Sequence, residues 1–228
     1  MLVLAGKTDG VIDTIEKYDL NSETWTKTSW KTPTAEGSSC AVSINSTKVM
    51  FLGGSSGGMG RRKAHILDLT DGSWTSLPDA PSDMKNSGCS TGSYQGNKGV
   101  FVSGGVGAET LSKFFDLTDQ QWKTLPNHNV NIKEGLYNPG GVWGDNPVVV
   151  ALDGTDMEQF DGESWVALST RSQFEARMAS AVTTVPEWFA HWLLSGDHID
   201  WAGESKCTRD IGRFPLNDIF ALFLKFQE

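Results

Sequence analysis

Short apolar runs alternate with polar turns along the chain, and the same order of runs and turns returns several times. One complete copy lies between Gly99 and Pro126, where an apolar run ends at Gly104-Gly105, a polar loop follows, and SKFFDL leads through a turn to Trp122. Short runs rich in Val, Phe, Leu and Trp, bounded by Gly, Asn, Asp and Pro, are typical of antiparallel strands joined by tight turns. The pattern predicts an all-β protein made of repeated units of four short strands.

Four tryptophans mark the period of this pattern at intervals of 49, 48 and 43 residues. Each follows an aromatic or apolar residue at a short, similar distance, as SKFFDL precedes its tryptophan in the complete copy. A four-stranded sheet cannot bury both of its faces alone, whereas stacked sheets bury each face on a neighbour. We therefore expect large rings to pack between sheets, with core tryptophans at Trp25, Trp74, Trp122 and Trp165 and repeat aromatics at Tyr18, Phe115 and Phe160.

Glycine pairs end the apolar run in two of the repeats, as Gly53-Gly54 and Gly104-Gly105. Glycine lets the backbone turn sharply or approach another strand closely. A nucleotide-binding loop would require a helix after the glycines, and each pair here lies between predicted strands. The glycine pairs are therefore predicted to be structural.

The motifs KYDLNSETW, ILDLTDGSW and FFDLTDQQW, each after a glycine-ended strand, resemble those of kelch-repeat β-propellers. The resemblance implies a propeller of about four to five four-stranded antiparallel blades in a single domain, as an incomplete ring or part of a larger one. Binding loops are then expected at one end of a central channel. The implied divisions are a partial blade at 1–30, blades at 36–79, 85–127 and 135–169, and a degenerate partial blade at 176–228.

The chain of 228 residues carries a formal net charge of −9, which argues against binding to nucleic acid or to a membrane surface. It contains no apolar run long enough to span a bilayer, and its first residues do not form a signal peptide. The odd set Cys40, Cys89 and Cys207 favours reduced thiols, with the first two as small buried residues at matching places in successive repeats. We therefore predict a cytoplasmic protein, although the sequon Asn45-Ser46-Thr47 leaves secretion open.

Catalytic or metal-binding residues do not form a convincing pattern. His191 and His198 make the single histidine cluster, and two histidines across a turn fall short of the three or four ligands of a transition-metal site. His65 and His128 are interpreted as packing or solvated residues, and no serine nucleophile motif is present. The sequence therefore predicts a protein that is not an enzyme and that has no metal or cofactor.

Loop residues on a rigid scaffold are the remaining place for recognition. The concentrated basic cluster Arg61, Arg62 and Lys63 would attract an acidic peptide, and Asn86, Tyr137 and Arg177 precede innermost strands. We expect a non-catalytic adaptor or scaffold module that binds a protein or peptide. The alternatives are a sugar-modifying or copper-dependent enzyme on a kelch-like propeller, and a truncated fragment without independent function.

Overall fold

The computed structural model describes residues 1–7, 10–57, 59–129, 141–143, 146–150 and 157–168, all of which belong to a compact unit of residues 1–182. Within these ranges there are sixteen strands and no helix, and every strand pairing is antiparallel. The all-β prediction is therefore confirmed. Residues 183–228 lie outside the described residues.

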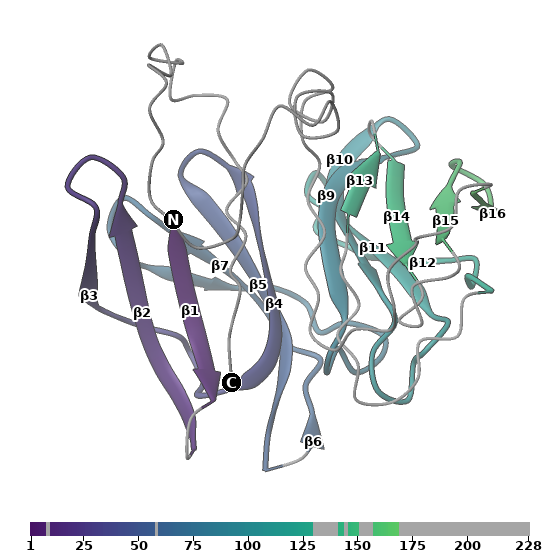
Figure 1. Ribbon diagram of the computed structural model, residues 1–228. Coiled ribbons are helices and arrows are strands. Elements are labelled where there is room, and N and C mark those ends of the chain that lie inside the picture. The colour runs from purple at the N-terminus through teal and green to yellow at the C-terminus, as the bar shows by residue number, and fades with distance from the viewer. Residues whose placement is uncertain (8–9, 58, 130–140, 144–145, 151–156, 169–228) are drawn as a thin grey trace, which may run out of the picture. The chain divides into compact units, whose positions relative to one another are not determined.

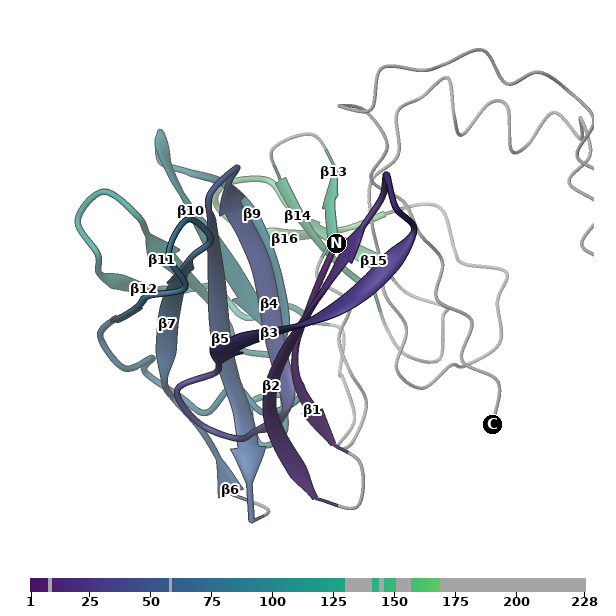
Figure 2. The ribbon, with the colours of Figure 1, turned by 90° about the vertical axis from the view of Figure 1, so that its left-hand side faces the viewer.

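Four sheets form from four successive segments of the chain (Figures 1 and 2). The first sheet has the order β1-β2-β3, and the second has the order β4-β5-β7-β8 with β6 paired to β5. The third and fourth sheets have the orders β9-β10-β11-β12 and β13-β14-β15-β16. The strands are β1 (Leu2–Lys7), β2 (Val11–Asp19), β3 (Thr24–Lys31), β4 (Gly37–Asn45), β5 (Lys48–Ser56), β6 (Met59–Gly60), β7 (Ala64–Asp68), β8 (Trp74–Ser76), β9 (Gly88–Tyr94), β10 (Asn97–Ser103), β11 (Ser112–Asp116), β12 (Trp122–Leu125), β13 (Gly141–Trp143), β14 (Asn146–Val150), β15 (Met157–Phe160) and β16 (Trp165–Ala167).

The aspartate of the repeated motif shapes the turn between the last two strands of each sheet. Its carboxylate accepts a hydrogen bond from the backbone N–H two residues later, which is an Asx turn. The same bond forms in all four sheets, at distances of 2.8 to 2.9 Å. The motif therefore recurs because each sheet needs the same turn, and the four residues are Asp19, Asp68, Asp116 and Asp161.

Alternate residues of the strands pack against different neighbouring sheets. On β5, Val49 contacts the cluster that contains Ile15 of the first sheet, whereas Met50 packs with Val100 of the third sheet. On β10, the next residue along, Phe101, packs instead with Phe160 of the fourth sheet. Successive side chains of a strand point to opposite faces of its sheet. The second and third sheets are therefore apolar on both faces. The core is therefore a series of layers between successive sheets.

A tryptophan also connects each of the last three sheets to the final residue of the preceding sheet or to the segment just after it. The indole Nε1 of Trp74 donates to the carbonyl oxygen of Lys31 at 2.8 Å. Trp122 donates in the same way to Pro78 at 2.8 Å, and Trp165 to Pro126 at 2.9 Å. Buried or half-buried indole N–H groups need such an acceptor. The repeated tryptophan thus contributes a directed hydrogen bond as well as apolar area.

Trp25 differs from the other repeat tryptophans, because 47% of its surface is exposed. It pairs with Tyr18 across β2 and β3, and the two ring centroids are 5.1 Å apart. The opposite face of the same sheet carries Ile15, which packs against the second sheet. No described sheet precedes the first one to cover the Trp25 face. The prediction that Trp25 is a core residue is therefore wrong.

Cys40 of β4 and Cys89 of β9 form a disulfide between the first strands of the second and third sheets. Their Cα atoms are 6.1 Å apart, and 49 residues separate them in the sequence. The prediction of reduced thiols at these positions is wrong, although the two residues do lie where strands of adjacent sheets approach each other. The physical reason is the repeat itself: equivalent residues of stacked sheets face each other.

Candidate functional site

The predicted basic cluster lies between β6 and β7, and each of its side chains has a partner. The Nε atom of Arg61 is 3.7 Å from Oε1 of Glu36, and Lys63 Nζ is 2.9 Å from Oδ1 of Asp79. The Nε atom of Arg62 donates to the carbonyl oxygen of Ala80. The two carboxylates offset much of the cluster's positive charge. Arg62 and Lys63 nevertheless remain exposed.

Glu36 is the central residue of this region. It directly precedes β4, and its carboxyl group is buried. The residue is 2% exposed, and its Oε1 atom accepts a hydrogen bond of 2.8 Å from the Thr34 hydroxyl. Burial raises the pKa of Glu36 above its usual range, while Thr34 and the nearby Arg61 guanidinium act in the opposite direction. The distance of 3.7 Å to Arg61 is an ion pair without a hydrogen bond. The carboxylate therefore has hydrogen-bonding capacity left.

Gly54, at the end of β5, makes room for this arrangement. Its φ is +92°, and a Cβ atom there would lie 2.3 Å from Ser39 Oγ and 2.9 Å from Glu36 Oε2. The Gly54 carbonyl also accepts a hydrogen bond from the backbone N–H of Arg61 at 3.0 Å. The second glycine of the pair thus lets Glu36, Ser39 and Arg61 converge on the end of one strand.

Asn86 joins the same region from the connection that enters the third sheet. Its backbone N–H donates to the carbonyl oxygen of Ser38 at 3.1 Å, its φ is +59°, and the residue is 5% exposed. A left-handed conformation is tolerated by asparagine more readily than by most residues. We call Glu36, Ser39, Arg61 and Asn86 the Glu36 cluster.

Three polar atoms of the Glu36 cluster are buried without a hydrogen-bond partner among the described residues: Ser39 Oγ, Arg61 Nε and Asn86 Oδ1. A buried polar group without a partner costs about 1–3 kcal/mol. Most such groups in native proteins are paired, so three of them in one region point to a ligand or to bound water. Together they offer a donor, an acceptor, and a hydroxyl that can serve as either.

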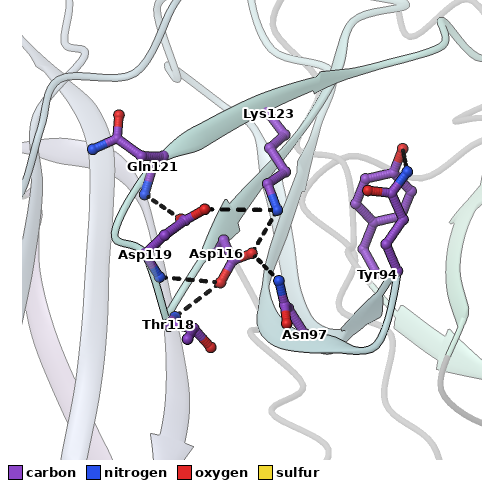
Figure 3. A network of polar contacts seen from close by, with 8 residues as sticks. Tyr94, Asn97, Asp116, Thr118, Asp119, Gln121 and Lys123 are labelled. Carbon is purple, nitrogen blue, oxygen red and sulfur yellow. Dashed lines mark hydrogen bonds and ion pairs between the residues drawn. The ribbon is translucent and has the colours of Figure 1, made fainter.

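The Asp116 network in the third sheet shows the contrasting case of a buried charge whose partners are complete (Figure 3). The Oδ2 atom of Asp116 accepts hydrogen bonds from Lys123 Nζ at 2.6 Å and from Asn97 Nδ2 at 2.7 Å, and Oδ1 accepts from the backbone N–H of Thr118 at 2.8 Å. The hydrogen bond from Lys123 is the main cause that holds the pKa of Asp116 far below its usual range. This carboxylate is fully used inside the fold and has a structural role.

The other residues singled out from the sequence do not join the Glu36 cluster. His65 and His128 are buried, and their rings lie edge-on against Trp74 and Trp165. In the described part of the chain, no group of three His, Cys, Asp or Glu residues could hold a metal ion, and no helix is long and apolar enough to cross a membrane. The remaining candidates lie outside the described residues: Tyr137, Arg177, His191 and His198.

Sequence reasoning found Arg61 and Asn86 but missed Glu36 and Ser39. Asn86 is a candidate because it precedes a predicted innermost strand, and the residue directly before the corresponding strand one repeat earlier, β4, is Glu36. Ser39 is hidden in the small-residue run GSSC and becomes visible only through its approach to Gly54. No protein-family model and no curated protein matches the chain.

Proposed function

We propose that the chain is part of a kelch-type β-propeller that acts as a non-catalytic protein-interaction module. Support for the architecture comes from the stacked antiparallel sheets and from the tryptophan hydrogen bond that recurs in three of them. A blade of four antiparallel strands packed on the next blade is the repeat unit of a propeller. The three-stranded first sheet then corresponds to an incomplete blade.

The Glu36 cluster is the proposed binding site, and the observation that carries the proposal is its three buried polar atoms that lack a hydrogen bond among the described residues. An extended peptide offers an N–H and a C=O group at each residue. Asn86 Oδ1 would accept from a peptide N–H, Arg61 Nε would donate to a peptide C=O, and Ser39 Oγ would take either role. We therefore expect recognition of main-chain amide groups of a partner protein, with limited dependence on partner charge.

The test compares peptide binding by protein variants at two adjacent arginines. Binding is measured on an immobilised peptide array and, for the best peptides, by titration calorimetry. Arg61→Ala removes a member of the Glu36 cluster, whereas Arg62→Ala removes an exposed charge beside it. We expect Arg61→Ala and Ser39→Ala to weaken binding by about tenfold or more, since each removes a hydrogen bond made in a buried setting. Arg62→Ala should change binding little.

Two results would contradict the proposal. If Arg62→Ala and Lys63→Ala abolish binding while Arg61→Ala does not, the exposed basic residues would be the site, and an acidic peptide would be the expected partner. If no peptide binds to the folded wild-type protein, the interaction function itself fails. Circular dichroism of each variant separates loss of binding from loss of fold.

A further inference from the structure

The sequon Asn45-Ser46-Thr47 forms the tip of the hairpin between β4 and β5. Asn45 pairs with Lys48 across this turn, and all three residues of the sequon are exposed. The middle residue is Ser, so the sequon meets the requirement that this position is not Pro. The sequence motif therefore occupies the kind of surface turn in which a glycan can be attached without displacing the core.

The hydrogen bonds within the turn leave the nitrogen of the Asn45 side chain available. The Oδ1 atom accepts from the Thr47 backbone N–H at 2.9 Å and from the Thr47 hydroxyl at 3.1 Å. The Nδ2 atom has no hydrogen-bond partner among the described residues. The sequon threonine thus contacts the amide whose nitrogen would carry a sugar.

The Cys40–Cys89 disulfide is an independent observation on the environment in which the chain folds. Disulfides form and persist in oxidising compartments such as the secretory lumen and the extracellular space, and they are rare in the cytosol. The prediction of a cytoplasmic protein drew on reduced cysteines and on first residues that do not form a signal peptide, and the disulfide removes the first of these two grounds. Sequon glycosylation and disulfide formation share the secretory route.

We propose that Asn45 carries an N-linked oligosaccharide, added as the chain passes through an oxidising secretory compartment. The donor is an oligosaccharide attached through its anomeric carbon to a lipid pyrophosphate. A bond forms between Asn45 Nδ2 and that anomeric carbon, the bond from the anomeric carbon to the pyrophosphate oxygen breaks, and the amide loses one proton. The lipid pyrophosphate leaves, and no oxidation or reduction takes place.

The position of Asn45 is compatible with binding at the Glu36 cluster, although the inference does not depend on that function. Ser39 and Asn45 lie six residues apart on β4, which corresponds to roughly 20 Å along the strand. The glycan would therefore extend from one end of the strand, while the Glu36 cluster occupies the other.

The experiment expresses the full chain behind a cleavable secretory leader in eukaryotic cells and measures its mobility before and after peptide-N-glycosidase treatment. The wild type and Thr47→Ser, which keeps the sequon, are expected to lose mass on treatment. Asn45→Gln and Thr47→Ala, which destroy the sequon, are expected to run at the deglycosylated position without treatment. A secreted wild type that runs with Asn45→Gln would overturn the modification site.

A second measurement addresses the protein in its natural source. The peptide that contains Asn45 is isolated from the native protein, and enzymatic deglycosylation in heavy-oxygen water should convert Asn45 to labelled Asp. Recovery of unmodified Asn45 as the main species would overturn the proposal for the natural protein.

Discussion

Reduction of the Cys40–Cys89 disulfide is expected to destabilise the protein by about 4 kcal/mol. The bond closes a loop across a sequence separation of 49 residues. A cross-link of that span removes about 14 cal/mol/K of chain entropy from the unfolded state, which corresponds to about 4 kcal/mol at 25 °C. Small domains are stable by only about 5–15 kcal/mol in total, so the loss is large enough to measure.

The assay is urea unfolding of the wild type and of Cys40→Ala/Cys89→Ala, each with and without a thiol reductant. The wild type should lose about 4 kcal/mol of unfolding free energy on reduction, and the double variant should not respond to the reductant. The dependence on urea should be steeper without the disulfide, because the unfolded chain then exposes more surface. Free energies rather than midpoints must therefore be compared.

A thiol titration under denaturing conditions provides the control. Reduction should increase the number of reactive thiols by two. If the untreated protein already shows those two thiols, or if full reduction leaves the unfolding free energy unchanged, the reasoning from the disulfide is refuted.

Further predictions concern single side chains. Trp165→Ala should lower the unfolding free energy by about 3–5 kcal/mol, because its ring is buried against the third sheet. Trp25→Ala should lower it by less than about 1 kcal/mol. Equal losses in urea unfolding would show that the Trp25 face is covered. Burial lowers the pKa of Lys113 to about 8, so the unfolded state binds more protons than the folded state between about pH 8 and 10. Over that range, the stability of the wild type should rise relative to that of Lys113→Met. Parallel pH profiles of the two proteins would be the contrary result. Asp116→Asn should cost about 1.5–3 kcal/mol at neutral pH through lost charge-assisted bonds. That cost should decrease only below roughly pH 4, where the unfolded carboxyl becomes protonated; a cost that falls between pH 7 and 5 would contradict the lowered pKa.

The strands and turns were predictable because their determinants are local. The aspartate of each motif acts on a backbone N–H two residues away, and the alternation of apolar residues sets the faces of each strand. The exposure of Trp25 was not predictable from the motif, because burial of this ring would need a neighbouring sheet that the described residues do not provide. The repeat establishes that a tryptophan is present but not that a partner covers it.

The disulfide and the Glu36 cluster depend instead on contacts between repeats. Cys40 and Cys89 are separated by 49 residues, which is one repeat, so the stacking of equivalent strands brings them together, although the odd number of cysteines favours reduced thiols. Glu36 and Asn86 both precede the first strand of a sheet, so a comparison of equivalent positions identifies them together. Ser39 depends on the close approach at Gly54, which no sequence pattern specifies.

Three kinds of interaction link the second and third sheets. They are the Trp122 hydrogen bond, the apolar cluster around Met50, and the Cys40–Cys89 disulfide. The Glu36 cluster spans this interface, since Ser39 directly precedes Cys40 on β4 and Asn86 lies three residues before Cys89. Because a binding site needs its polar groups held in fixed positions, the disulfide contributes to the geometry of the cluster as well as to stability. If the cluster binds a peptide as proposed, reduction of the folded protein should therefore weaken that binding under conditions in which the sheets remain folded.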